Sequence, residues 1–195
     1  MGIILDSYTV YFDLVVSDLE GVIIANGRKN LYNSVGQNVS DSKWFRAAME
    51  CTTGEDYGWE TAHRSPLVNN ELALVYTTAV RKDGETRGKA IGALGIIFRF
   101  EALAQTIVED VPLSKEEEER SRVCIVSDKG LVLADSDHRN LEDTIEFEKR
   151  DELFNIKKGF IIDKYNGAEC CIGHAVAPGY ETYTTGWHSL IIQKL

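Results

Sequence analysis

Hydrophobic residues occur along the chain in short β-branched runs that polar turns separate. In the stretch 15–26 (VVSDLEGVIIAN), two runs of Val and Ile flank the polar residues 18–21 (DLEG). The break ends in Gly21, and glycine is the residue best able to take a positive φ. This pattern predicts a tight β-hairpin. The stretch 123–135 (VCIVSDKGLVLAD) repeats it later in the chain, which indicates one small sheet built twice.

The first half continues with a helix and long strands. The predicted elements are a polar loop over 29–41, a short helix that carries Trp44 and is capped by Ser40 or Asp41, an irregular stretch over 52–70, strands over 71–81 and 90–100, and a helix over 101–109. Apolar residues at near-helical spacing indicate the first helix, and Ser and Asp are preferred caps. Irregular stretches as long as 52–70 are uncommon in compact domains and are often functional.

The second half repeats this order in a shorter form. The predicted elements are an acidic helix over 115–120 capped by Ser114, the second hairpin, a small helix near 151–154, and strands over 158–164, 168–176 and 187–193. The two halves together predict an α+β chain of two tandem PAS-like units, each a five-stranded antiparallel sheet flanked by short helices. The expected domains are residues 1–112 and 113–195, with the boundary at Pro112.

Length and net charge limit the number of domains and the kinds of partner that the chain can have. A chain of 195 residues can bury the core of one large domain or two small ones. The net charge of -10 argues against a nucleic-acid partner, because a phosphate backbone is bound by clustered Lys and Arg. The start has no secretory signal, and no apolar run has the length of a transmembrane helix. We therefore expect a cytosolic protein or a soluble piece of a longer one, and the apolar end of the chain favours the piece.

The sequence contains no motif for catalysis or for a metal. Cys51, Cys124, Cys170 and Cys171 lack the CxxC spacing of structural zinc sites, so buried free thiols are expected. The segment 135–138 (DSDH) offers carboxylates and an imidazole, but residues this polar after a strand are more often a turn. A nucleophile elbow, an HExxH motif and a phosphate loop are all missing from the sequence. We expect no enzymatic activity, no cofactor and no metal.

Five motifs in their order and spacing resemble a known family. They are DLVVSDLEGVIIANG, VGQNVSDSKWFRAAM, VYTTAVRKDGE, IGALGIIF and SDKGLVLADSD. Together they resemble the double Cache sensor domains of bacterial chemoreceptors, sensor histidine kinases and diguanylate cyclases, over about residues 8–193. The resemblance implies a sensory domain without catalysis, whose first, membrane-distal unit binds a small molecule and whose second unit passes a shift to a following helix.

The same resemblance implies a location and partners. Most such domains are extracytoplasmic, in the periplasm, whereas free thiols would favour the cytoplasm as the alternative. A homodimer in the full-length receptor and an output signalling domain in the same polypeptide are also implied. A structural or dimerisation module without a ligand is the competing hypothesis for the chain.

The chain departs from the family at two places. Only a short segment precedes the first strand, where the family has a long helix that mediates dimerisation. The branch that binds amino acids carries an Arg where this chain has Ser42, and an acidic residue in the later strand where this chain has residues 94–97 (LGII). The second departure argues against an amino acid as the ligand.

Candidate binding residues gather after the first hairpin. Aromatic walls with a few placed polar groups are typical of small-molecule sites, and an Arg suits a carboxylate because it binds bidentately. The expected ligand-binding residues are Trp44, Tyr57, Trp59, His63, Arg64, Tyr76, Thr78 and Arg81. A strand places Tyr76 and Thr78 on one face and Arg81 on the other.

These candidates also have structural interpretations. Trp44 and Tyr76 could be core residues, and His63 and Arg64 could be solvated. Arg81 could pair with Asp83 or Glu85 at the end of its strand. The segment 180–183 (YETY) follows Pro178-Gly179 and is expected to form a structural turn.

Overall fold

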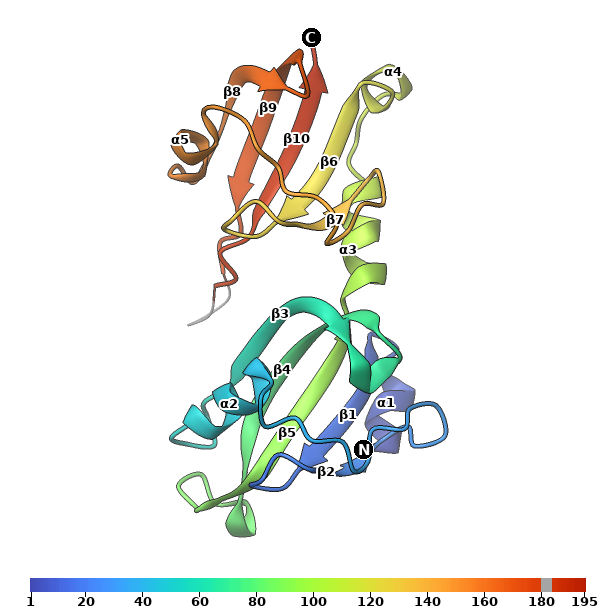
Figure 1. The fold of residues 1–195 in the computed structure, drawn as a ribbon, viewed down its shortest axis with the longest axis vertical. Helices are drawn as coiled ribbons and strands as arrows, with labels where there is room; N and C mark the ends of the chain where they lie inside the picture. The colour runs from blue at the N-terminus through green and yellow to red at the C-terminus, as the bar shows by residue number, and fades with distance from the viewer. Residues whose placement is uncertain (180–183) are drawn as a thin grey trace. The chain divides into compact units, whose positions relative to one another are not determined.

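A computed structural model describes residues 1–179 and 184–195 (Figure 1). The turn expected at 180–183 lies outside the described residues. Contacts between residues divide the chain into unit 1, Met1–Phe100, and unit 2, Glu101–Leu195. Each unit contains one five-stranded antiparallel sheet with short helices, so the predicted α+β class of two PAS-like units is confirmed.

Unit 1 has the strand order β2-β1-β5-β4-β3. Its elements are α1 (Gly2–Ser7), β1 (Tyr11–Ser17), β2 (Ile23–Asn26), α2 (Lys43–Glu50), β3 (Gly58–Ser65), β4 (Glu71–Arg81) and β5 (Ala90–Arg99), with 3-10 turns at Pro66–Val68 and Lys82–Gly84. The core lies between α2 and one face of the sheet, where apolar side chains of β1, β4 and β5 pack together.

Unit 2 has the equivalent order β7-β6-β10-β9-β8. Its elements are α3 (Phe100–Glu109), α4 (Lys115–Glu118), β6 (Ser121–Val126), β7 (Val132–Asp135), α5 (Arg150–Phe154), β8 (Lys158–Tyr165), β9 (Ala168–Val176) and β10 (His188–Lys194). In each unit the last strand of the chain segment, β5 or β10, lies in the middle of the sheet, as the predicted repeat requires.

The duplicated hairpin has the same local geometry in both units. Gly21 and Gly130 adopt φ values of 78° and 82°, which favour glycine because a Cβ is strained there. The residue directly before β2 or β7 then forms a single antiparallel bridge with a later loop residue, Val22 with Asn38 and Leu131 with Thr144. The hairpins predicted from the sequence are therefore confirmed.

The prediction of an irregular stretch over 52–70 is wrong from residue 58 onward, because β3 and then a 3-10 turn occupy residues 58–68. β3 is an edge strand that pairs with β4 alone, and its register shifts between Glu60 and His63. Its sequence (GWETAHRS) has little of the apolar alternation that marks a half-buried strand. Pairing with β4, rather than local pattern, makes it a strand.

The expected cap of the first helix is also corrected. Ser42, not Ser40 or Asp41, is the N-cap of α2, and its hydroxyl accepts a hydrogen bond from Phe45 N at 3.3 Å. Ser40 bonds to the Asn38 side chain instead. The cap must directly precede the first helical residue with extended backbone angles, and Ser42 has φ -70° and ψ 147°.

Unit 1 ends at Phe100 and unit 2 begins at Glu101. The domain boundary predicted from the sequence lies later, because it assigns residues 101–112 to the first domain. Within unit 2, Gln105 on α3 donates a hydrogen bond to Asp135 O at 3.1 Å. His138 Nε2 also lies 3.7 Å from a carboxylate oxygen of Glu109. These contacts associate α3 with β7 and the residues that follow it.

Candidate functional site

The face of the unit 1 sheet that carries the core is closely covered by α2. Trp44 is 2% exposed and belongs to the core. A Cβ on Gly95 would lie 3.1 Å from the Trp44 ring, and a Cβ on Gly58 would lie 2.6 Å from the Ala47 Cβ. Because glycines stand at both contact points, helix and sheet touch directly there, and Trp44 fills the space expected for a ligand.

A carboxylate already occupies the N-terminus of α2. Glu60 Oε2 accepts a hydrogen bond from Trp44 N at 3.1 Å. A negative charge near a helix N-terminus is favourable because the free N–H groups carry partial positive charge. An anionic ligand at this helix end would therefore meet a like charge.

A pocket lies on the opposite face of the same strands. It has a volume of about 280 Å³ and is lined by Tyr57, Tyr76, Thr77, Thr78, Leu94 and Ile96. Tyr76 pairs with Ile96 across β4 and β5, and Thr78 pairs with Leu94. Directly paired residues in an antiparallel sheet project to the same side, so these four side chains share one face.

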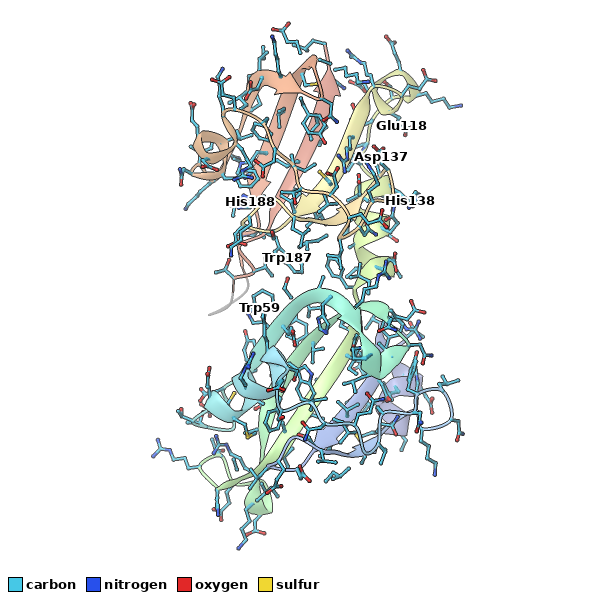
Figure 2. The ribbon with its side chains drawn as sticks, in the orientation of Figure 1. Trp59, Glu118, Asp137, His138, Trp187 and His188 are labelled. Atoms are coloured by element: carbon cyan, nitrogen blue, oxygen red, sulfur yellow. The ribbon has the colours of Figure 1, made fainter. Side chains whose placement is uncertain are left out.

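Trp59, labelled in Figure 2, lies on the edge strand β3 and extends this face toward the edge of the sheet. It is the direct partner of Tyr76 in the pairing of β3 with β4. Trp59, Tyr76 and Ile96 therefore form a row across three adjacent strands. The register of the sheet brings together three residues that lie far apart in the sequence.

The loop that carries Tyr57 is held in place by two sets of hydrogen bonds. The Asp56 carboxylate accepts bonds from the Thr52 hydroxyl and from the N–H groups of Thr52 and Thr53. These bonds lower the pKa of Asp56 to about 2. Asp56 O accepts a further bond from the Thr78 hydroxyl at 2.8 Å. Thr78 thus ties this loop to β4, which positions Tyr57 beside the pocket.

Arg81 lies away from the pocket, at the end of β4. Its guanidinium donates to Gly88 O at 2.8 Å and to Cys51 O at 2.6 Å, rather than to Asp83 or Glu85. It therefore joins the strand end to the residue that follows α2. The ligand role of Arg81 stays a prediction.

His63 and Arg64 lie further along β3. His63 pairs with Ala73 of the core, and its Nδ1 lies 2.9 Å from Thr61 O. Arg64 is exposed and pairs with Leu72. The structure thus brings together Tyr57, Trp59, Tyr76 and Thr78 but not the other expected ligand-binding residues.

Leu94 and Ile96 line the pocket but were not expected from the sequence. The signal that could have found them is the predicted pairing of strands 71–81 and 90–100. A hairpin register places Leu94 and Ile96 opposite Thr78 and Tyr76. Register depends on the turn between strands, and that turn has an irregular 3-10 geometry with Asp83 at φ 58°.

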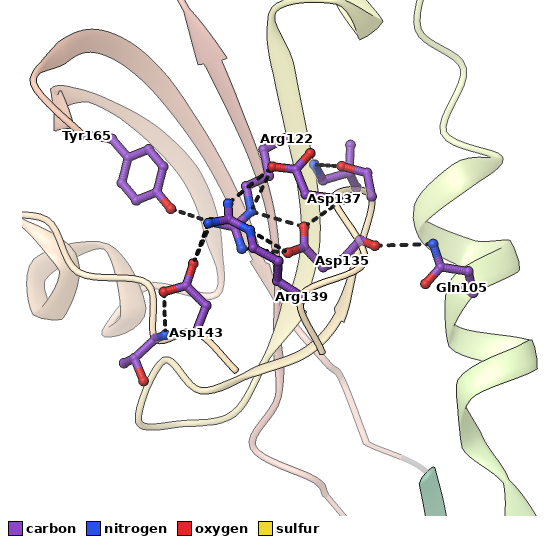
Figure 3. Close-up of polar contacts among 10 residues, drawn as sticks. Gln105, Arg122, Asp135, Asp137, Arg139, Asp143 and Tyr165 are labelled. Carbon is purple, nitrogen blue, oxygen red and sulfur yellow. Dashed lines mark hydrogen bonds and ion pairs between the residues drawn. The ribbon is translucent and has the colours of Figure 1, made fainter. Parts of the chain in front are cut away.

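Unit 2 contains a polar cluster that the sequence only hinted at (Figure 3). Arg122 on β6 is 6% exposed and pairs with Asp135 and Asp143. The signal was a single charge inside an otherwise apolar strand, SRVCIV. Asp135, which the sequence placed in a turn or metal segment, is the last residue of β7 and is fully buried.

Outside residues 180–183, no group of three or more His, Cys, Asp and Glu side chains is arranged to hold a metal ion. No described helix has the length and apolar character needed to cross a membrane.

No protein-family model matches the chain, and no curated protein matches it in sequence. Solved structures match it in fold. The extracellular domain of the putative histidine kinase rpHK1S-Z16 has a TM-score of 0.69 and 12% identity, covering 100% of this chain and 75% of that one. The ligand-binding domain of the Campylobacter jejuni chemoreceptor Tlp3, in complex with 4-methylisoleucine, has a TM-score of 0.69 and 16% identity, covering 99% and 68%.

An extracellular ligand binding receptor from Desulfohalobium retbaense also has a TM-score of 0.69, at 13% identity. The match covers 100% of this chain and 32% of that one, so the chain spans about a third of that receptor. Similarity at these identities establishes the fold. The chain has the tandem PAS-like fold found in the extracellular domain of a histidine kinase and in the ligand-binding domain of a chemoreceptor, as its resemblance to double Cache domains implied.

Proposed function

We propose that the chain is the sensory, ligand-binding domain of a bacterial signal-transduction protein and that unit 1 binds a small organic molecule. The observation that carries this proposal is the pocket beside Tyr57, Tyr76 and Thr78. It lies in a fold that also occurs in a chemoreceptor domain solved with a small molecule, 4-methylisoleucine. The pocket includes three residues that the sequence had singled out.

The lining suggests the chemistry of the ligand. Two tyrosines, Leu94 and Ile96 provide aromatic and aliphatic surface, and the pocket lining contains no charged residue. Such walls favour an uncharged or weakly polar molecule, because an ion would lose its hydration without gaining a partner. Arg64 and Arg81 lie outside the lining, so a carboxylate has less support in unit 1.

The proposed mechanism is a population shift. Tyr57 lies on the loop before β3, whereas Tyr76 lies within β4. A ligand that contacts both favours the arrangement in which loop and sheet are held together, and only such a difference in affinity can bias an equilibrium. An extracytoplasmic location, a homodimer and an output domain in the same polypeptide are parts of this proposal that rest on the family resemblance.

The proposal is tested by a thermal-shift screen against neutral organic molecules, nucleobases among them, with organic acids and amines as the charged comparison. A compound that binds the folded chain must raise the melting temperature, and the rise must grow with its concentration. Tyr76→Ala should weaken binding by about tenfold or more, because a buried tyrosine in contact with a ligand carries a large share of the affinity.

Tyr8→Ala is the matched control, since Tyr8 is an exposed tyrosine of unit 1 outside the pocket. It should leave the shift unchanged. If no compound moves the melting temperature and sedimentation shows a stable dimer, the ligand proposal fails and the structural module is the better description.

A further inference from the structure

Unit 2 has a pocket of its own, at the end of its sheet where β6 begins. Its volume is about 270 Å³. Arg122 and Tyr165 form part of its wall, Ala168 and Cys170 lie along β9, and Lys194 ends β10. Nothing in the unit 1 proposal uses these residues.

Arg122 is held rigidly in the wall of this pocket (Figure 3). Its Nε donates to Asp135 Oδ1 at 3.0 Å, and its Nη1 donates to Asp143 Oδ2 at 3.0 Å and to the Tyr165 hydroxyl. Its Nη2 donates to Asp135 Oδ2. A guanidinium has five N–H groups, so one of them has no partner among the described residues.

Tyr165 adds a second donor to the same wall. Its hydroxyl oxygen accepts the bond from Arg122, which leaves its own proton free for another acceptor. Burial raises the pKa of Tyr165, so the hydroxyl stays protonated at neutral pH. The wall therefore offers an O–H donor beside a fixed positive group.

The pocket lining carries four cationic side chains, Arg120, Arg122, Arg139 and Lys194, and two acidic ones, Glu119 and Asp137. Arg120 and Lys194 line the pocket, and the described residues form no ion pair with either of them. Arg120 Nη1 donates to Lys194 O at 3.2 Å, which keeps the two residues together. This excess of cations stands out in a chain with a net charge of -10.

One part of the wall is apolar, whereas Ser121 and Asn166 add neutral polar groups elsewhere in the lining. Ala168, Cys170 and Ile192 form the apolar part, and both Cys170 and Ile192 are buried core residues. At about 270 Å³ the pocket lies just below the roughly 300–1,000 Å³ typical of sites for drug-sized ligands, so it suits a smaller molecule. A molecule that matches this lining combines an anionic group with a short apolar part.

Unit 1 closes the equivalent corner with its own residues. Asp13 stands on β1 opposite Ile97, as Arg122 stands on β6 opposite Ile192. Asp13 is fully buried and accepts bonds from Gly27 N and Arg28 N at 3.0 and 2.9 Å. The guanidinium of Arg28 then donates to Leu5 O of α1 at 2.8 Å. In unit 1 the residues around Gly27 and Arg28, together with α1, occupy this corner of the sheet. In unit 2 the equivalent corner is the pocket.

We propose that the pocket of unit 2 binds a small carboxylate with a short aliphatic chain. Arg120 and Lys194 supply the compensating charge, Tyr165 donates a hydrogen bond to the carboxylate, and Ala168, Cys170 and Ile192 contact the aliphatic part. This site is separate from the unit 1 pocket, and either can exist without the other.

The test follows backbone amide shifts of the full chain, labelled with ¹⁵N, during titration with acetate, propionate and succinate in a chloride buffer. At least one acid should give saturable shifts at Ala168, Cys170 and Ile192. The double variant Arg120→Ala/Lys194→Ala should weaken binding by about tenfold or more, because hydrogen bonds to charged groups are among the strongest. Ala168→Leu, which fills the apolar wall and keeps every charge, should abolish the shifts.

Lys158→Ala is the control, because Lys158 is an exposed lysine of the same sheet outside the pocket. It should bind like the wild type. Saturable binding that survives both the double variant and Ala168→Leu overturns the proposal. So does equal binding of sulfate, or the absence of saturable shifts on β9 and β10 for all three acids. Shifts confined to Tyr76 and Leu94 would show that the acid binds in unit 1 and would overturn this proposal.

Discussion

Arg122 and Asp135 are side chains of unit 2 that are 7% and 0% exposed. Removing two such charges from water costs several kcal/mol per ion, and only good geometry with further hydrogen bonds offsets it. Burial by itself would raise the pKa of Asp135, but the hydrogen bonds from Arg122 outweigh it and the pKa is lowered. Asp143 and Tyr165 take up the remaining donors of Nη1.

This arrangement predicts an asymmetric response to substitution. Arg122→Met leaves the buried Asp135 with only the 3.9 Å contact to the half-exposed Arg139 and should lower the free energy of unfolding by about 3–5 kcal/mol. The double variant Arg122→Met/Asp135→Leu should lose clearly less than Arg122→Met alone, because it leaves no buried charge unpaired. Urea denaturation at pH 7 measures both. This account would be contradicted if the double variant lost as much free energy of unfolding as Arg122→Met and Asp135→Leu lose together when each is measured alone.

His174 and His188 form a second buried pair in unit 2, with Nε2 of His174 2.7 Å from Nδ1 of His188. Both rings stack with Phe154. Burial lowers the pKa of both histidines, and that of His174 falls to about 4 with a further contribution from His188. Asp128 acts in the opposite direction on His188, and Arg150 lies over the Phe154 ring.

The pair predicts acid sensitivity of unit 2. In the unfolded chain these histidines take up protons near pH 6.5, whereas folded His174 resists protonation down to about pH 4. The unfolded state therefore binds more protons in this window, and stability is lost as the pH falls from 6.5 toward 4. Melting temperatures across this range should show the fall, and His174→Phe should make it shallower. An unchanged slope in the variant would contradict the role of the pair.

At the scale of elements, the contact of α2 with its sheet depends on small residues. Gly58 on β3 faces Ala47, and Gly95 on β5 faces the Trp44 ring. The sequence predicted β4 with its bounds and the presence of the helix that carries Trp44, although not its cap, because both have clear local patterns. It missed β3, because an edge strand with a register shift has no regular alternation to detect.

The contact predicts that a single methyl group is costly on β3. Gly58→Ala should lower the free energy of unfolding by about 1–3 kcal/mol, the usual range for overpacking, since its Cβ would lie 2.6 Å from the Ala47 Cβ. Gly173→Ala is the matched control on β9, where the nearest atom to a Cβ, Ile191 O, is 3.8 Å away. It should be close to neutral. Equal losses in the two variants would show that the cost comes from glycine replacement in general.

At the scale of the whole chain, one strand order occurs twice and carries two different sets of polar residues. Unit 1 closes the corner at Asp13 with chain segments and has an apolar pocket on its opposite sheet face. Unit 2 leaves the equivalent corner open beside Arg122. A duplicated sheet therefore provides two distinct candidate sites.

The sequence by itself determined the duplication, the hairpins and most strands, because these depend on apolar runs and on turn residues such as Gly21 and Gly130, which act locally. Only the tertiary structure decided which sheet face α2 covers, and so separated Trp44 from Tyr76. It also decided that Arg122 lies opposite Asp135 and Asp143. Faces and partners of this kind follow from strand register and long-range packing, which no local pattern encodes.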